Sequence, residues 1–297
     1  MAALITSNFT MPQEYAAGVF KKAQSTSALA QLSGAMPQKF GKTNVMVLTS
    51  APKAEIVAEG GEKSPTPTAY ANKTISPIKL QVTARVSNEV MWADEDYQMG
   101  ILSDVGENCG IALGRALDIV GIHKANPLTG AVAASVTEGL CDATDKAQLA
   151  GTKFDDAIEA ASGLVIANGY TPTGIACDPA LSFGLATMRD TTGRRIYPEL
   201  GYGQGVASFE GMTAAVSDTV SGKELAKASD IIGLVGQFDA FRWGVQREIA
   251  MHTIEFGDPD GLGDLQRLNQ VAIRAEIVYG IGILDLKAFA KVVKAAA

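Results

Sequence analysis

The most constraining feature of this sequence is one long alternation of apolar and polar residues near its C-terminus. Residues 271–283 carry an apolar side chain at every second position: Val271, Ile273, Ala275, Ile277, Tyr279, Ile281 and Ile283. A period of two is typical of a strand with one buried face, and a straight strand of this kind spans about 40 Å. A compact enzyme domain rarely needs such a strand, so the pattern favours a flat, extended subunit.

A second alternating run occupies residues 78–86 and follows a stretch rich in turn formers. Upstream of it, Ile56 and Val57 lead into a run of charged residues and glycines, Glu59-Gly60-Gly61-Glu62-Lys63, and then into Pro65 and Pro67. Prolines and a polar tip argue against a central strand of a sheet. We therefore predict a long hairpin over residues 54–88 that projects from the body as a ribbon.

Helical periodicity marks residues 94–122, where apolar residues recur every three or four positions. Acidic residues begin this segment and His123 follows it, as the helix dipole favours.

The sequence of residues 1–50 predicts an arm, with a helix that starts at Pro12 and an extended stretch over 39–50. Such an arm has little core of its own and must bury its apolar residues elsewhere, for example on a neighbouring subunit.

The rest of the chain predicts an α/β stretch followed by a β-rich one. Asp178-Pro179 has the pattern of an N-cap followed by a proline in the first turn of a helix. The other predicted elements are a helix over 152–168 with Thr152 as its N-cap, strands at 174–177, 212–216, 231–235, 241–245 and 249–256, and an end of the second helix near 189–190.

Composition restricts the class of protein. Hydrophobic residues make up 47% of the chain and charged residues 19%, so a packed globular protein is expected. The net charge of -7 argues against a nucleic-acid reader, because an acidic surface repels phosphate. Three isolated cysteines fit a reducing compartment, and no apolar run predicts a membrane span.

No catalytic, cofactor-binding or metal-binding residue is predicted. Asp258-x-Asp260-Gly261 resembles part of a calcium loop, but Leu262 stands where the next oxygen ligand belongs, so a turn is the better interpretation. The glycines between 201 and 211 lack the strand and helix context of a phosphate loop. His123 and His252 are the only histidines, and we expect a helix-end or surface position for each.

Lys63 and Lys73 lie in the predicted ribbon. The simpler interpretation is that both lysines are solvated, and that their charge discourages unwanted pairing of other strands with the edge of the ribbon. The alternative is an isopeptide bond to an asparagine of another subunit, which needs a neutral lysine amine and a carboxylate general base in an apolar site. No pattern in the sequence indicates such a site.

The order of these elements resembles the Hong Kong 97-type major capsid protein of tailed phages over about residues 20–292. Five short segments carry the resemblance in the family's order: 58–63, 82–89, 117–123, 188–194 and 235–241, with Gln237 where the family has an acidic residue. The resemblance implies an α+β fold. Its parts would be an N-terminal arm (1–50), an E-loop hairpin with the first peripheral strand (51–88), a spine helix (89–127), an axial domain (128–237) and a peripheral sheet (238–297).

The resemblance also implies a function. Pentamers and hexamers of this chain would form an icosahedral shell around double-stranded DNA, in a virion assembled in the host bacterial cytoplasm. Its partners would be copies of itself, weakly and non-specifically contacted DNA, and a scaffold, portal or decoration protein. The chain lacks the long leading scaffold region of some members, so we expect either a mature start or a separate scaffold protein. The candidate intersubunit contacts are Glu59, Lys63, Tyr70, Lys73, Arg194 and Arg195.

Two other classes of protein fit parts of the pattern. An encapsulin-like nanocompartment uses the same fold and would need a site for a cargo peptide. An α/β enzyme would need titratable groups that converge in a pocket, and a monomeric state in solution would favour this alternative. The near absence of histidine and of catalytic motifs weighs against the enzyme.

Overall fold

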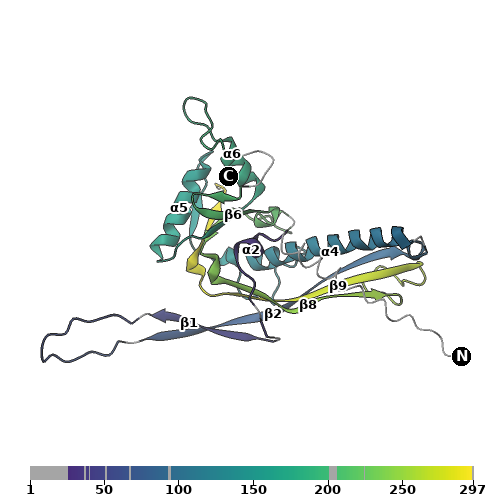
Figure 1. Cartoon of the computed structure of the whole chain (residues 1–297), viewed down its shortest axis with the longest axis horizontal. Coiled ribbons are helices and arrows are strands. Elements are labelled where there is room, and N and C mark those ends of the chain that lie inside the picture. Colours follow the sequence, from purple (N-terminus) through teal and green to yellow (C-terminus); the bar gives the residue numbers. More distant parts are fainter. Residues whose placement is uncertain are drawn as a thin grey trace.

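A computed structural model describes residues 26–36, 38–39, 41–50, 52–66, 68–92, 95–200, 206–223 and 225–295. The predicted helix that starts at Pro12 lies outside these residues. The molecule is extended: a long flat sheet with one helix along it forms the base, a second unit stands on one end of that base, and a thin ribbon projects beyond the same end (Figure 1).

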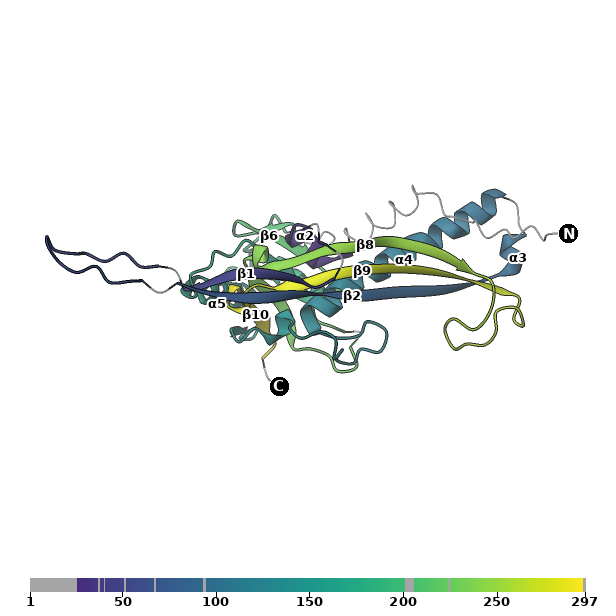
Figure 2. The same cartoon turned by 90° about the horizontal axis from the view of Figure 1, so that it is seen from below.

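The base is a four-stranded antiparallel sheet in the order β1-β2-β9-β8. Its strands are β1 (Thr43–Ser50), β2 (Ala69–Ser87), β9 (Gln270–Ile283) and β8 (Phe241–Ile254). The long predicted strand is confirmed as β9, and its apolar positions are buried, as at Ile277 and Tyr279. Figure 2 shows β2, β9 and β8 side by side, with the long helix behind them.

That helix, α4 (Glu95–His123), confirms the predicted helix. Its C-terminal half lies in the main core, where Leu113 and Leu117 are fully buried among residues of β8 and β9. Close packing here depends on Gly121. A Cβ atom at that position would lie 2.7 Å from a methyl carbon of Leu29 and 3.0 Å from the Phe241 ring.

The upper unit is a six-stranded mixed sheet in the order β3-β10-β7-β4-β6-β5. Its strands are β3 (Lys146–Gln148), β10 (Phe289–Val293), β7 (Ile231–Gly236), β4 (Gly174–Cys177), β6 (Met212–Val216) and β5 (Ser208–Phe209). Helices α5 (Phe154–Ala167) and α6 (Pro179–Thr187) pack on it and close a second core. Asp178 caps α6 as predicted, since its side chain accepts a hydrogen bond from the Ala180 amide.

Four sequence-based boundaries were wrong. Helix α5 begins at Phe154 with Lys153 as an N-cap that makes no side-chain bond, so Thr152 is not the cap. Helix α6 ends at Thr187, before the predicted 189–190. The predicted strands at 241–245 and 249–256 are one strand, β8, whose register shifts at bulges. The C-terminal β10, placed with the peripheral sheet, pairs instead with β7 and β3 of the upper unit.

The sequence-based prediction also misplaced the first strand of the ribbon. The sequence suggested that it begins near residue 54 and that residues 39–50 belong to the arm. Instead β1 pairs with the first half of β2, from Thr43 opposite Ile75 to Leu48 opposite Tyr70. Residues 52–66 form no strand. Pro52 and Pro65 lack the amide that a ladder needs, so apolar Ile56 and Val57 were a misleading signal.

A short segment crosses the sheet between helix α2 (Ala28–Leu32) and β1. We call residues 33–36, 38, 39 and 41 the strap. The backbone amide of Met36 donates to the carbonyl of Trp243 at 2.9 Å, and the side-chain amide of Gln38 donates to the carbonyl of Gly280 at 3.3 Å. Gly244 and Gly280 are cross-strand partners beneath it. A Cβ atom at either position would collide with the Met36 carbonyl or the Gln38 side chain, so this glycine pair forms the notch that admits the strap.

Substituting the notch should destabilise the subunit. In Gly244→Ala the new methyl group meets backbone rather than a movable side chain, and we expect a loss of about 2 kcal/mol in unfolding free energy. The matched control is Gly163→Ala in α5, where a Cβ atom meets nothing within 4 Å. That change should stabilise the helix by about 0.5–1 kcal/mol. Urea unfolding of the two variants measures the opposite signs, and equal shifts would contradict the notch.

Candidate subunit-contact surfaces

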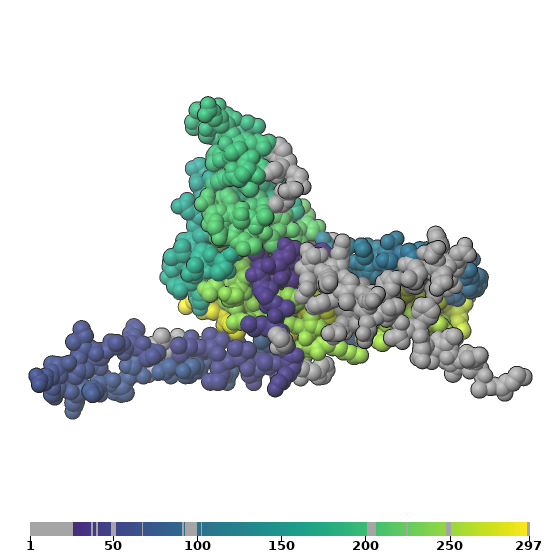
Figure 3. All heavy atoms as spheres, viewed as in Figure 1, coloured from purple at the N-terminus to yellow at the C-terminus, as the bar shows by residue number. Residues whose placement is uncertain are grey.

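The first candidate surface is the ribbon, which we define as β1, residues 52–66 and 68, and residues 69–75 of β2. It extends away from both cores (Figure 3). One of its faces carries apolar side chains in the open: Met46 is 67% exposed, Tyr70 is 61% exposed, and Leu48 lies directly opposite Tyr70. An isolated two-stranded hairpin is marginally stable in water, so this ribbon needs a partner to cover that face.

The ribbon's end is a turn at Glu59-Gly60, where Gly60 takes a left-handed φ of 80°. Ser64 bonds to Glu55 through both its amide and its hydroxyl, each at 3.2 Å, which brings the two sides of the loop together. The predicted contact residues Glu59 and Lys63 are exposed here. The structure therefore places Glu59, Lys63 and Tyr70 on one projecting element.

Lys73 lies at the root of the ribbon and contacts its own subunit. Its ammonium group lies 3.0 Å from the carboxylate of Glu138, in the segment that follows α4. The two side chains are 35% and 41% exposed, so water reaches the pair. An isopeptide bond needs an apolar site around a neutral amine, and the surroundings of Lys73 are of the opposite kind.

The segment 189–195 carries Arg194 and Arg195 and is closed by a bridge between Arg189 and Arg195. It forms a turn at the top of the upper unit, far from the ribbon (Figure 1). Asp190 organises this turn by accepting hydrogen bonds from Thr192 and from the Arg194 amide. These bonds, with that from Thr192 the strongest, lower the pKa of Asp190. Arg194 is exposed and Arg195 is half-buried, so the six predicted contact residues fall on two separate surfaces.

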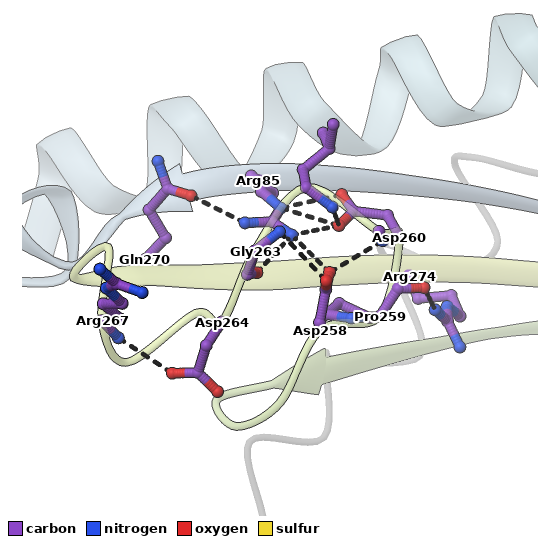
Figure 4. Close-up of polar contacts among 11 residues, drawn as sticks. Arg85, Asp258, Pro259, Asp260, Gly263, Asp264, Arg267, Gln270 and Arg274 are labelled. Atoms are coloured by element: carbon purple, nitrogen blue, oxygen red, sulfur yellow. Dashed lines mark hydrogen bonds and ion pairs between the residues drawn. The ribbon is translucent and has the colours of Figure 1, made fainter.

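A third surface lies at the end of the base farthest from the ribbon, where the loop 255–269 joins β8 to β9. Arg85 of β2 bonds there to both carboxylate oxygens of Asp260, to Asp258 and to the carbonyl of Gly263 (Figure 4). The guanidinium group lowers the pKa of Asp260 through its hydrogen bonds. The predicted turn is confirmed, because the Asp258 carboxylate accepts the amides of Gly261 and Gly263.

The sequence offered no signal for Arg85, since 173 residues separate it from Asp258. Both aspartates that resemble calcium ligands face this cation instead. Within the described part of the chain, no group of three or more histidine, cysteine, aspartate or glutamate side chains could hold a metal ion.

Loss of the Arg85 side chain should loosen this loop without unfolding the sheet. In Arg85→Ala we expect the amides of Gly261 and Gly263 to exchange with solvent faster, while the amides in the middle of β9 keep their protection. Hydrogen exchange with mass spectrometry measures both. Lys79→Ala is the control, because Lys79 lies on the same face of β2 and pairs with Glu276 at 2.9 Å, away from the loop. Equal exchange in the two variants would contradict this role.

A buried polar junction joins helix α2, helix α4 and the upper unit, and no motif in the sequence indicated it. Asp118 of α4 is fully buried. One carboxylate oxygen accepts the hydroxyl of Ser27 at 2.5 Å and the amide of Leu29 at 3.0 Å. The other accepts the amide of Ala28 at 2.9 Å and the hydroxyl of Thr219 at 2.7 Å. The donors come from the start of α2 and from the upper unit, so one side chain joins both to the long helix.

Two neighbours on α4 extend this junction. Arg115 pairs with Asp218 at 2.6 Å. The His123 ring lies 3.1 Å from the carbonyls of Thr219 and Val220, and burial lowers the pKa of that ring. His123 ends the helix, as predicted, but it is buried, while His252 on β8 is exposed. The upper unit is thus fastened to the helix by polar contacts at successive turns.

Comparison with known proteins agrees with this architecture. The sequence matches the phage capsid family over residues 7–294. A solved structure from Mycobacterium phage Ogopogo is 48% identical, with 92% of this chain and 93% of that chain covered and a TM-score of 0.83. One from Gordonia phage Cozz is 34% identical over 92% and 87% of the two chains, with a TM-score of 0.79. A comparison with curated proteins gives no match.

More distant structures share the fold alone. The capsid of the native GTA particle is 14% identical, covers 92% of this chain and 91% of its own, and has a TM-score of 0.65. No helix in the described residues is long and apolar enough to cross a membrane.

This extended subunit, with its projecting ribbon and its upper unit joined to α4 by polar contacts, has the Hong Kong 97-type fold. Proteins of this class are structural and form shells. The chain belongs to the phage capsid family. It is a major capsid protein of a tailed phage and a component of the virion, and the encapsulin-like alternative is not favoured.

Proposed function

We propose that this capsid protein assembles as pentamers and hexamers into an icosahedral shell around double-stranded DNA, with its ribbon laid across a neighbouring copy. The observation that carries the proposal is the exposed apolar face of Met46, Leu48 and Tyr70 on a two-stranded element without a core. Covering that face removes apolar area from water, and repetition of the contact around a shell multiplies its effect.

The remaining surfaces complete the proposal. The upper unit, residues 128–237 together with β10, would form the axial domain, and its Arg194 and Arg195 turn would face the centre of a capsomer. Glu59, Lys63 and Tyr70 would contact the neighbour, while Lys73 would set the angle of the ribbon through Glu138. The role is structural, without catalysis. With a net charge of -7 the shell would hold DNA weakly, and scaffold, portal and decoration proteins would be its other partners.

Negative-stain electron microscopy with sedimentation velocity on the purified chain tests the assembly. We expect closed icosahedral particles or rings of five and six subunits. DNA inside particles from infected cells would distinguish a phage head from a nanocompartment. A homogeneous monomer or dimer that salt, crowding agents and an added scaffold protein leave unchanged would overturn the proposal.

A further inference from the structure

Three arginines lie within the short turn 189–195 at the top of the upper unit. Arg189 and Arg194 are exposed and Arg195 is half-buried. Asp190 is the one acidic residue of this segment, so the turn has a formal charge of +2 in a chain whose net charge is -7. We call residues 189–195 the arginine turn. Figure 3 shows it at the tip of the upper unit, away from the base.

The backbone of the arginine turn is held in one conformation. One oxygen of the Asp190 carboxylate accepts the amide and the hydroxyl of Thr192, at 2.8 and 2.7 Å, and the amide of Arg194 at 2.9 Å. Gly193 takes a left-handed φ of 83°, which glycine adopts without strain. The guanidinium group of Arg189 donates to the carbonyl of Gly193 at 2.8 Å. The carboxylate of Asp190 thus binds the turn itself, and the exposed Arg194 side chain starts from a fixed backbone.

Assembly would repeat this charge around an axis. This step rests on the proposed function, in which five or six upper units meet at the centre of a capsomer with the arginine turn facing the axis. Each copy then adds its Arg194 to one ring of like charges, and their mutual repulsion opposes assembly. Salt screens charges that are close together only in part. An anion on the axis would remove this repulsion, because it meets the same arginine from every copy.

The chemistry of the ring selects the kind of anion. A guanidinium group presents a planar fork of donors that fits two oxygens of one phosphate group, which makes arginine a preferred residue for binding phosphate. A ligand on a fivefold or sixfold axis needs acceptors on all sides, and a short chain of phosphate groups offers them at high charge density. A DNA duplex spreads its charge along its length, so it would bring few phosphates to the ring.

We propose that the arginine turns of one capsomer together bind a small polyphosphate anion at the capsomer axis, either inorganic or the triphosphate of a nucleotide. Arg194 contacts the anion, since it is the exposed arginine whose backbone the turn fixes. Asp190 and Arg189 are positioning residues, because they hold the turn. A single subunit contributes one Arg194 to this site, so the site is complete only in the assembled ring.

Titration calorimetry with sodium tripolyphosphate tests the proposal on DNA-free particles or rings assembled from the purified chain. We expect one bound anion for every five or six chains, and weaker binding at higher salt. Arg194→Gln should weaken binding by about 100-fold or more, because one hydrogen bond to a charged group contributes about 10-fold and every copy loses its own. Arg247→Gln is the matched control, since Arg247 is an exposed arginine of β8 in the base, and this variant should bind like the parent.

Two further arms sharpen the test. Arg194→Lys keeps the charge but loses the planar fork, so we expect an affinity between those of the parent and of Arg194→Gln, and this variant replaces Arg194→Gln if that chain does not assemble. ATP in place of tripolyphosphate distinguishes the two sources of the anion. Equal affinities would mean that the phosphate groups alone are recognised, and tighter binding of ATP would mean that the nucleoside contributes as well.

Four outcomes would overturn the anion site. They are no binding of either anion, one anion bound per chain, equal weakening in Arg194→Gln and Arg247→Gln, and binding of a DNA duplex without binding of tripolyphosphate. A parent chain that forms neither rings nor particles would instead count against the proposed function.

Discussion

The variant Asp118→Ala should lose about 3 kcal/mol of unfolding free energy, the largest effect that we expect from one side chain. The change leaves the buried amides of Ala28 and Leu29 without their acceptor, and each orphaned donor costs about 1–3 kcal/mol. It also removes the acceptor of Ser27 and Thr219. Urea unfolding of the unassembled subunit measures the loss, and limited proteolysis should find new cleavage near residues 26–36.

Asp218→Ala is the control for this result. Asp218 lies at the same junction, one residue from Thr219, but its side chain is 42% exposed and pairs with Arg115. A partly exposed ion pair of this kind contributes about 1 kcal/mol or less. Equal losses from the two variants would mean that the four hydrogen bonds of Asp118 do not hold the parts of the subunit together.

The same carboxyl group should make stability depend on pH. Burial raises the pKa of Asp118, and the hydrogen bonds from Ser27 and Thr219 oppose that rise. A carboxyl with a higher pKa in the folded state stabilises folding fully below its unfolded pKa of about 3.9, and this contribution is lost as the pH rises through the folded pKa. Asp118→Asn does not titrate, so the stability of the parent relative to this variant should fall as the pH rises above about 4. A difference that is independent of pH would contradict the shift.

Removal of the ribbon should abolish closed shells while leaving the subunit folded. Residues 45–73 can be replaced by Asn-Gly between Asn44 and Thr74, which are cross-strand partners and accept a two-residue turn. Ile75 is buried and Ser76 pairs with Ile281, so the deletion must end before them. Both cores lie outside the deleted segment, so we expect an unchanged urea midpoint. Electron microscopy should show no particles, because the contact with the neighbour is gone.

Point variants that keep the full length of the ribbon test whether its exposed apolar face is what shell closure requires. Serine at Met46, Leu48 and Tyr70 should also prevent closure, since the three side chains form the apolar face. Serine at Asn44 and Asn72, polar residues exposed on the same face, should not. Normal particles from the triple variant would show that the ribbon acts through another surface.

Patterns within short stretches of sequence determined much of this protein. The alternation over 271–283, the helical spacing over 94–122 and the cap and proline at Asp178-Pro179 each report a repeat or a cap that neighbouring residues create, and each is present in the structure. The order of these elements carried the resemblance to a capsid fold. The polar, turn-rich sequence around the tip of the ribbon also made it possible to predict that Glu59, Lys63 and Tyr70 are exposed.

Only the tertiary structure decided which distant segments meet. Four contacts join residues that are far apart in the chain. They are the pairing of β1 with β2, the pairing of β10 with β7 in the upper sheet, the hydrogen bonds of Asp118, and the ion pair between Arg85 and Asp258. No local period encodes a partner across 90 or 173 residues. Such partners are selected by packing and by the need of buried donors and acceptors for one another, and both exist only once the chain has folded.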